Sequence, residues 1–182
     1  LQPKGPSSDS CFYGYQTESL SIAYEKNPGD PKISHHLSLL VNNYGDIEKE
    51  VSIAYARRST APGRLPAQSR DYITAASHRF ALTDGLNQYR TGTLYETLDY
   101  EINHLAHDIN DLVSYRQTQN AFDGLIGGAV SFDQPLSHGG ASTARLLSWN
   151  RTLFWSSALD AVLPLGQTGS VLLAHHEETA CF

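Results

Sequence analysis

The chain has no methionine, only two cysteines and no long hydrophobic run. Its longest apolar stretch, residues 124–130, is far shorter than the roughly 20 residues that a membrane-spanning helix requires. Basic residues are scarce as well, because 13 Lys and Arg stand against 19 Asp and Glu, which gives a formal net charge of -6. Such a molecule repels nucleic-acid phosphates and anionic lipids. We therefore expect no nucleic-acid partner and no membrane span.

Several catalytic signatures are absent too. The sequence contains no phosphate-binding Gly-rich loop, no Gly-x-Ser-x-Gly nucleophile elbow, no His-Glu-x-x-His helix and no Cys-x-x-Cys pair. These absences remove the enzyme classes that are easiest to identify, and no cofactor is expected. Whether the protein is an enzyme stays open at this point.

What is present is enough material for one domain. The 182 residues are 40% hydrophobic, which supports a single core. Cys11 and Cys181 lie near the two ends, and the ends of a domain are often close in space, so we expect a disulfide between them. We thus predict a flexible leader over residues 1–10 and one globular domain over residues 11–182. Two unrelated thiols in a cytosolic protein are the alternative.

A disulfide requires an oxidising compartment, so it predicts a secreted or extracytoplasmic protein of the periplasm, the cell surface or a virion surface. A possible glycosylation site at Asn150, within Asn150-Arg151-Thr152, fits a secretory route. Such triplets also arise by chance, and the nearby aromatic residues could bury this one.

The first third of the chain carries the alternating pattern of strands. Apolar residues recur at every second position over residues 20–24, 33–41 and 51–55. Turn-forming residues separate these segments at 27–30 and 42–46. The pattern predicts three antiparallel strands connected in sequence order.

Two helices are expected after these strands. Leu94, Leu98, Ile102 and Leu105 step by four or three residues, which predicts one long amphipathic helix over about residues 93–120. Ser69 as a cap and Gly85 as a stop predict a shorter helix over about 69–82. The fold class would then be α+β, with an antiparallel sheet packed against the long helix.

That long helix would place titratable groups on one face. Glu101, His104 and Asp108 are spaced by three or four residues, so on a helix they could act as a general base with an orienting acid, or hold a metal. A solvated helix face explains the same spacing. His138, beside Gly139 and Gly140, is a second catalytic candidate because glycine N–H groups can bind an oxyanion.

Two histidine doublets suggest a different chemistry. His35 and His175 lie in predicted strands near opposite ends of the chain, and they could form a metal or pH-sensing pair if those strands were neighbours. Rings that merely cover the edges of the core are the simpler interpretation.

The candidate binding residues are basic and aromatic. Residues 57–70 hold no acid and form the only locally basic segment, and two tryptophans follow near the end of the chain. We select as binding candidates Arg57, Arg58, Arg64, Arg70, Trp149 and Trp155. A solvated connector and ordinary core packing are the alternatives.

The missing catalytic motifs favour a secreted or surface-exposed recognition module of receptor-binding, adhesive or toxin-like type, with a protein or glycan partner. A secreted hydrolase or transferase that uses a His–carboxylate site is the first alternative. A histidine-based metal or pH sensor is the second. The sequence does not indicate an oligomeric state.

Overall fold

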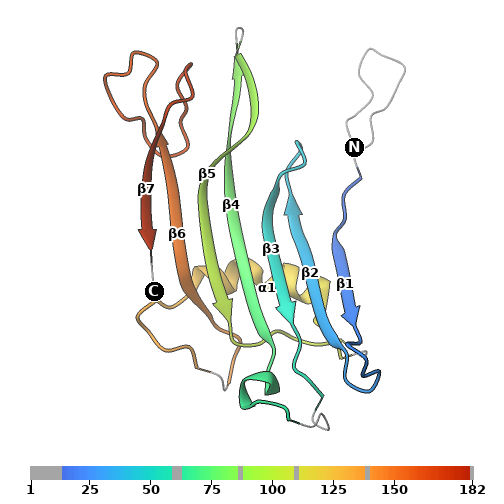
Figure 1. Cartoon of the computed structure of the whole chain (residues 1–182). Helices are drawn as coiled ribbons and strands as arrows, with labels where there is room; N and C mark the ends of the chain where they lie inside the picture. The colour runs from blue at the N-terminus through green and yellow to red at the C-terminus, as the bar shows by residue number, and fades with distance from the viewer. Residues whose placement is uncertain (1–13, 59–62, 86–87, 109–110, 138–139, 181–182) are drawn as a thin grey trace, which may run out of the picture.

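The computed structural model describes residues 14–58, 63–85, 88–108, 111–137 and 140–180. Within these ranges seven strands form one antiparallel sheet, and each strand pairs with the next one along the chain (Figure 1). The strands are β1 (Glu18–Ala23), β2 (Lys32–Val41), β3 (Ile47–Ala54), β4 (Tyr72–Gly85), β5 (Gln88–Ile102), β6 (Ala144–Phe154) and β7 (Ala174–Ala180). The helical elements are η1 (Pro66–Ser69), a turn of 3-10 helix, and α1 (Tyr115–Gly127).

The three early strands match the predicted ones. β1, β2 and β3 pair antiparallel, and Leu20 lies opposite His35, which in turn lies opposite Ile53. The alternation of apolar and polar residues specifies this register, because a shift by one residue would turn every apolar side chain to the wrong face.

The predicted helix over residues 93–120 is wrong. Residues 93–102 belong to β5, and α1 begins only at Tyr115. A step of four residues is also a multiple of the strand period of two, so Leu94, Leu98 and Ile102 share a face on either element. Tyr100, buried between Leu98 and Ile102, completes the strand pattern. The sheet is therefore not packed against one long helix.

The predicted second helix over residues 69–82 is wrong as well. The short η1 ends at Ser69, and β4 follows from Tyr72. Tyr72, Ile73 and Thr74 are aromatic or β-branched and favour a strand. β4 and β5 then form a long hairpin that extends beyond the neighbouring strands (Figure 1).

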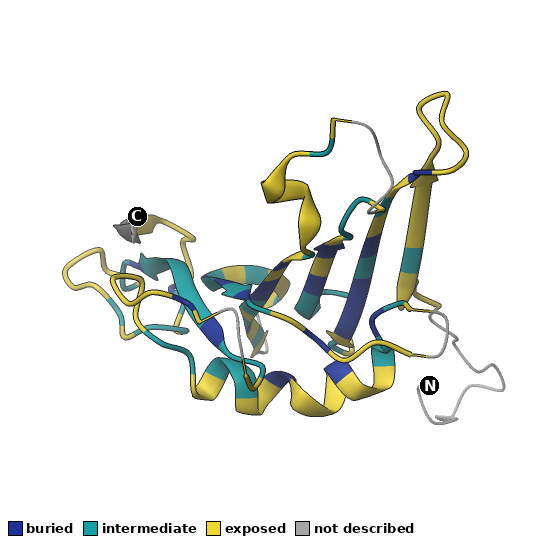
Figure 2. Cartoon of the chain, turned by 90° about the horizontal axis from the view of Figure 1, so that it is seen from below, coloured by how far each residue is buried: buried dark blue, intermediate teal, exposed yellow. Residues whose placement is uncertain are grey.

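α1 covers one face of the sheet, which we call the inner face. The helix lies on one side of the strands, whereas η1 lies on the other (Figure 2). Phe122 and Thr118 are the buried side chains of α1. The core beneath the helix consists of Leu37, Leu39, Val51, Ile53, Ile73, Ala75, Tyr100, Ile102, Leu105, Val113, Phe122 and Ala144.

The opposite face, which we call the outer face, is polar. Along the strand register one row contains Ser34, Ala54 and Tyr72, and the next row contains Ser52, Thr74 and Glu101. All of these except the half-buried Glu101 are exposed. Across the described residues, α1 packs on the inner face alone, so this outer face is the larger available surface.

Two further expectations concern the disulfide and a membrane span. Cys11 and Cys181 lie outside the described residues, so the expected disulfide stays a prediction. Among the described helices none has the length and apolar character needed to cross a membrane.

Candidate functional site

The predicted basic segment meets the turn between β1 and β2 at one end of the sheet. We call residues 24–31 of this turn, together with residues 55–58 and 63–72, the arginine corner. At its centre lies Asp30, which is only 3% exposed although it follows an exposed turn. A buried carboxylate requires charged or hydrogen-bonding partners.

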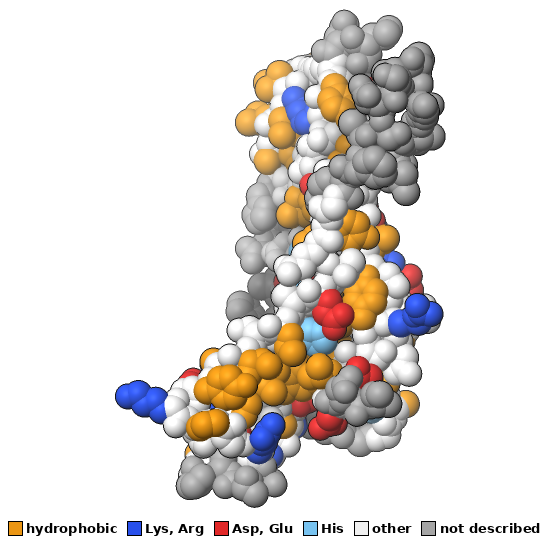
Figure 3. Space-filling model, turned by 90° about the vertical axis from the view of Figure 1, so that its right-hand side faces the viewer, with side chains coloured by type: hydrophobic (Ala, Val, Ile, Leu, Met, Phe, Trp, Pro, Cys, Tyr) orange, Lys and Arg blue, Asp and Glu red, His pale blue; other side chains and the backbone are white. Residues whose placement is uncertain are grey.

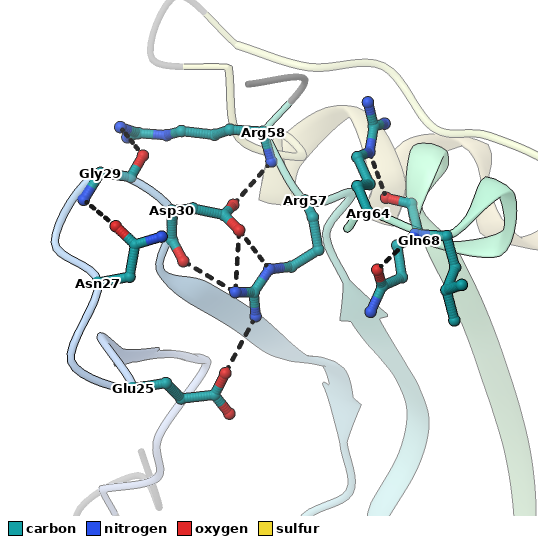
Figure 4. Close-up of polar contacts among 9 residues, drawn as sticks. Glu25, Asn27, Gly29, Asp30, Arg57, Arg58, Arg64 and Gln68 are labelled. Carbon is teal, nitrogen blue, oxygen red and sulfur yellow. Dashed lines mark hydrogen bonds and ion pairs between the residues drawn. The ribbon is translucent and has the colours of Figure 1, made fainter. Parts of the chain in front are cut away.

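Arg57 and Arg58 supply these partners (Figure 4). The Arg57 Nε donates to Asp30 Oδ2 at 2.9 Å, and its Nη2 donates to the Asp30 carbonyl oxygen at 3.0 Å. The Arg58 backbone N–H donates to Asp30 Oδ1 at 2.9 Å. A further contact of 3.3 Å joins Arg57 Nη1 to Glu25 Oε2. The corner thus ties the β1–β2 turn to the segment that follows β3.

The electrostatics agree with this geometry. The backbone hydrogen bond from Arg58 lowers the pKa of Asp30, and the Arg57 side chain adds to this effect against the opposing influence of burial. The hydrogen bond to Asp30 in turn raises the pKa of Arg57. Arg57 is therefore held in an internal ion pair, and its charge is already balanced within the corner.

The outward part of the corner consists of other residues. The Arg70 guanidinium lies 5.0 Å from the centre of the Tyr72 ring, within the range of a cation–π contact. Tyr72 is 42% exposed and Leu65 is 61% exposed. Arg64 donates from Nε to the Gln68 carbonyl oxygen at 3.3 Å. Of the four predicted binding arginines, Arg57 is thus mainly structural, whereas Arg70 presents its charge beside an exposed aromatic ring.

A second polar network lies under the connector between β5 and α1. The Tyr55 hydroxyl oxygen accepts from the Val113 N–H at 2.8 Å and lies 2.8 Å from His35 Nδ1. On its other side, His35 Nε2 lies 2.7 Å from Glu18 Oε1. With the Nε2–H donating to Glu18 and Nδ1 accepting from the Tyr55 hydroxyl, both ring nitrogens have a partner. Burial raises the pKa of Tyr55, although the bond from Val113 opposes this effect.

His107 lies at the outer end of this network. Its ring is 6.1 Å from Tyr55, and its two nitrogens each lie 3.0 Å from a carboxylate oxygen, of Asp71 and of Asp111. Ionised carboxylates only accept, so both contacts are satisfied when His107 is protonated. Burial alone would lower the pKa of His107, but the contacts with Asp111 and Asp71 reverse this effect and raise it.

The described members of the predicted catalytic set do not lie on one helix. Glu101 lies in β5 and accepts from Arg145 Nη2 at 2.6 Å. His104 and Asp108 lie in the irregular connector after β5. His138 lies outside the described residues. The helical face that would have aligned these groups does not exist.

The two predicted metal-binding histidines lie in strands that are not neighbours in the sheet. His35 is in β2 and His175 is in β7, with four strands between them in the sheet. No group of three or more metal-binding side chains occurs within the described part of the chain. His175 instead contacts Trp155, ring to ring, at 5.9 Å.

Trp149 belongs to a charged cluster on the inner face. Its Nε1 donates at 2.8 Å to Glu96, a carboxylate that is 4% exposed, and Arg79 lies 3.1 Å from the other oxygen of Glu96. Arg151 stacks 4.2 Å from the Trp149 ring centre. The neighbouring Asn150 is half-buried within β6 between two paired strands, and its glycosylation stays a prediction.

The sequence alone did not single out Asp30, Tyr55, His107 or Glu96 as site residues. The only signal for Asp30 was its place in a predicted turn, and its arginine partner lies 27 residues further along the chain. Contacts of this kind depend on strand pairing rather than on local spacing.

These features define a class: a single antiparallel sheet with one helix on one face and a charged corner at one end. Residues 1–108 match a family model described as the insecticide toxin TcdB middle/C-terminal region. Because the match covers more than half of the chain, the protein belongs to this family, and it is a toxin-like module. No relative was found among curated proteins.

Solved toxin complexes contain a similar fold. The chain is similar to part of the crystal structure of TcdB2-TccC3, with a TM-score of 0.59 and 17% identity over 87% of this chain. The structure of TcdB2-TccC3-Cdc42 gives a TM-score of 0.62 and 15% identity over 87% of this chain. The structure of a Photorhabdus luminescens Tc holotoxin pore with a TccC3 mutation gives a TM-score of 0.60 and 17% identity over 87% of this chain. The chain spans only 8%, 8% and 7% of those chains, respectively.

Proposed function

We propose that this chain is one folded segment of a longer Tc-type insecticidal toxin component, in which it recognises protein surfaces of its own assembly. The observation that carries the proposal is the difference in coverage. The alignment with TcdB2-TccC3 covers 87% of this chain but only 8% of the much longer matched chain. A segment of that size has neighbours along the same polypeptide and must pack against some of them.

The architecture supports a role in contacts. Within the described residues, β1 and β7 each pair with a strand on one side only, and α1 covers a single face of the sheet. Unpaired strand edges and an uncovered face are features that larger assemblies bury. Figure 3 looks at the molecule from the side of β1, and it shows hydrophobic side chains gathered in the lower part of this view. Three exposed apolar residues lie at every second position in β1 and just beyond its end, namely Leu20, Ile22 and Tyr24.

A protein partner is favoured over a glycan or a host receptor. The similar solved structures are complexes that contain TccC3, and one of them also contains Cdc42. A toxin component of this type acts outside the cell that makes it, which agrees with an extracytoplasmic location. We include in this proposal the view that residues 11–182 fold as one unit of the longer polypeptide.

A chimeric toxin component tests this function. The segment of TcdB2 that overlays on this chain is replaced by the chain itself, and the product is copurified with TccC3. We expect the chimera to assemble with TccC3 as the parent does, because the fold is shared.

The matched control is a chimera that carries an unrelated β-sheet domain of equal length at the same place. Equal copurification of this control would show that the segment is only a spacer. A chimera that is monodisperse and has a cooperative melt but does not assemble would contradict the proposal directly.

A further inference from the structure

We propose that the outer face beside the arginine corner binds an acidic, extended polypeptide segment. This inference rests on the proposed function, because it names the kind of protein surface that the module would recognise. It depends on three features of the described residues: a flat row of small side chains, an aromatic–cation pair at its end, and a local excess of positive charge.

The flat row is formed by residues that lie opposite one another on four neighbouring strands. Ser21, Ser34, Ala54 and Tyr72 follow in register from β1 to β4, and all four are exposed. We call this row the shelf. Three strand spacings of about 4.8 Å make it roughly 14 Å long, which matches four or five residues of extended chain. Only small side chains precede Tyr72, so a backbone can approach the sheet closely.

The aromatic–cation pair stands between two hollows. Tyr72 and Arg70 both line a hollow of ≈ 260 Å³ that also includes Ala54 and Lys32. The same pair lines a second hollow of ≈ 190 Å³ on the side of Thr74. Tyr and Arg are among the residue types that most often dominate binding energy at protein interfaces. A ridge of this kind gives apolar side chains of a bound segment a pocket on either side.

The charge around the shelf is positive although the whole chain carries a net charge of -6. Arg57 is shared by two acids, Asp30 and Glu25, and the exposed Arg58 supplies a second positive charge beside them. Two further acids have partners of their own, because Asp71 pairs with His107 and Glu101 with Arg145. Lys32 is exposed and takes part in no ion pair within the described part of the chain. The Arg70 guanidinium lies over the Tyr72 ring. An acidic segment complements this surface, whereas a basic one would be repelled.

The test uses the complete 182-residue chain and a fluorescein-labelled peptide of alternating Glu and Leu residues. Fluorescence anisotropy should show saturable binding that weakens as the salt concentration rises. The Tyr72→Ser and Arg70→Gln variants should each bind about tenfold more weakly or worse. Tyr89→Ser and Arg116→Gln change an exposed tyrosine and an exposed arginine elsewhere, and they should bind as the unmodified chain does.

Ala54→Glu provides a second variant, because it blocks the exposed shelf and reverses its charge without removing a core side chain. Binding should be lost while the melting temperature stays unchanged. The proposal is overturned if this variant binds normally, if no Glu-Leu binding is seen, or if a Lys-Leu peptide binds as tightly. It is also overturned if the shelf serves a different occupant: a dimer that Tyr72→Ser disrupts in sedimentation, or vesicles of phosphatidylserine that Tyr72→Ser no longer binds.

The two proposals fail separately. A chain that does not bind the acidic peptide but whose TcdB2 chimera still assembles with TccC3 leaves the proposed function in place and removes only this inference.

Discussion

The two faces of the sheet are built from alternate residues of the same strands, yet they differ in almost every physical respect. On the inner face Ile53, Ile73 and Ile102 lie in one row and are buried under α1 and its connector. On the outer face the neighbouring row of Ala54 and Tyr72 is exposed. Burial of apolar surface stabilises the fold on one side, and the other side is left available for contacts. Single substitutions can test this division of roles.

The largest effect is expected at Phe122, the α1 side chain that fills the core. Phe122→Ala removes a fully buried ring and leaves a cavity, so the free energy of unfolding should fall by about 3–5 kcal/mol. Urea denaturation followed by circular dichroism measures this loss. Gln117→Ala changes an exposed residue of the same helix and should leave the midpoint nearly unchanged. Equal effects of the two substitutions would show that α1 does not anchor the inner face.

The next largest effect is expected at the arginine corner. Asp30→Asn removes the charge that pairs with Arg57, so the melting temperature should fall more than in Glu25→Gln, whose carboxylate is more exposed. The folded pKa of Asp30 is lowered, so its stabilisation is complete above the ordinary value of 3.8 and is lost as the pH falls through the folded pKa. Melts recorded across this acid range should show a decline that is smaller in Asp30→Asn. An identical decline in both proteins would argue against the ion pair.

A smaller effect with the opposite pH dependence is expected at His107. Its folded pKa is raised from 6.5, so its stabilisation is complete below that value and is lost as the pH rises through the raised pKa. His107→Gln should remove this loss between mildly acidic and mildly alkaline pH. His104→Gln, in the same connector, should keep the slope of the unmodified chain. Thermal melts over a pH series distinguish the two, and a slope that persists in His107→Gln would assign it to another group.

The smallest effect is expected at Arg64. Its side chain makes one long hydrogen bond to a backbone carbonyl, so Arg64→Ala should change the stability by no more than about 0.5 kcal/mol. Arg57→Ala should cost clearly more, because it leaves the buried Asp30 without its guanidinium partner. Chemical denaturation of both variants compares an outward arginine with an internal one. If Arg57→Ala lost as little stability as Arg64→Ala, the ion pair of the corner would contribute nothing to stability.

The sequence predicted the strands correctly where apolar and polar residues alternate without ambiguity. The prediction was wrong where the spacing of apolar residues fits both the strand period and the helix period. The first three strands were found because apolar residues recur at every second position between clear turns. β5 was mistaken for a helix because Leu94, Leu98 and Ile102 are compatible with both elements. Only the beginning of α1, residues 115–120, fell within a predicted helix. The helix is largely polar and buries only Thr118 and Phe122, so its hydrophobic stripe is weak.

Of the candidate site, only the basic composition of one segment could be predicted from the sequence. The basic character of residues 57–70 pointed to the arginine corner and included Arg70 beside Tyr72. The sequence could not separate Arg57 from Arg70, since the internal role of Arg57 depends on Asp30 across two strands. Likewise, the partners of His107 are Asp71, which lies just before β4, and Asp111 in its own connector, and the first of these becomes a neighbour only after the sheet has formed.

The order of the strands has a consequence for synthesis. Because every strand pairs with its predecessor in the chain, no strand has to wait for a distant partner before it can join the sheet. The sheet can therefore grow co-translationally, one strand at a time, as the polypeptide leaves the ribosome. This mode of growth limits the time during which an unpaired strand edge is exposed to the remainder of the nascent chain.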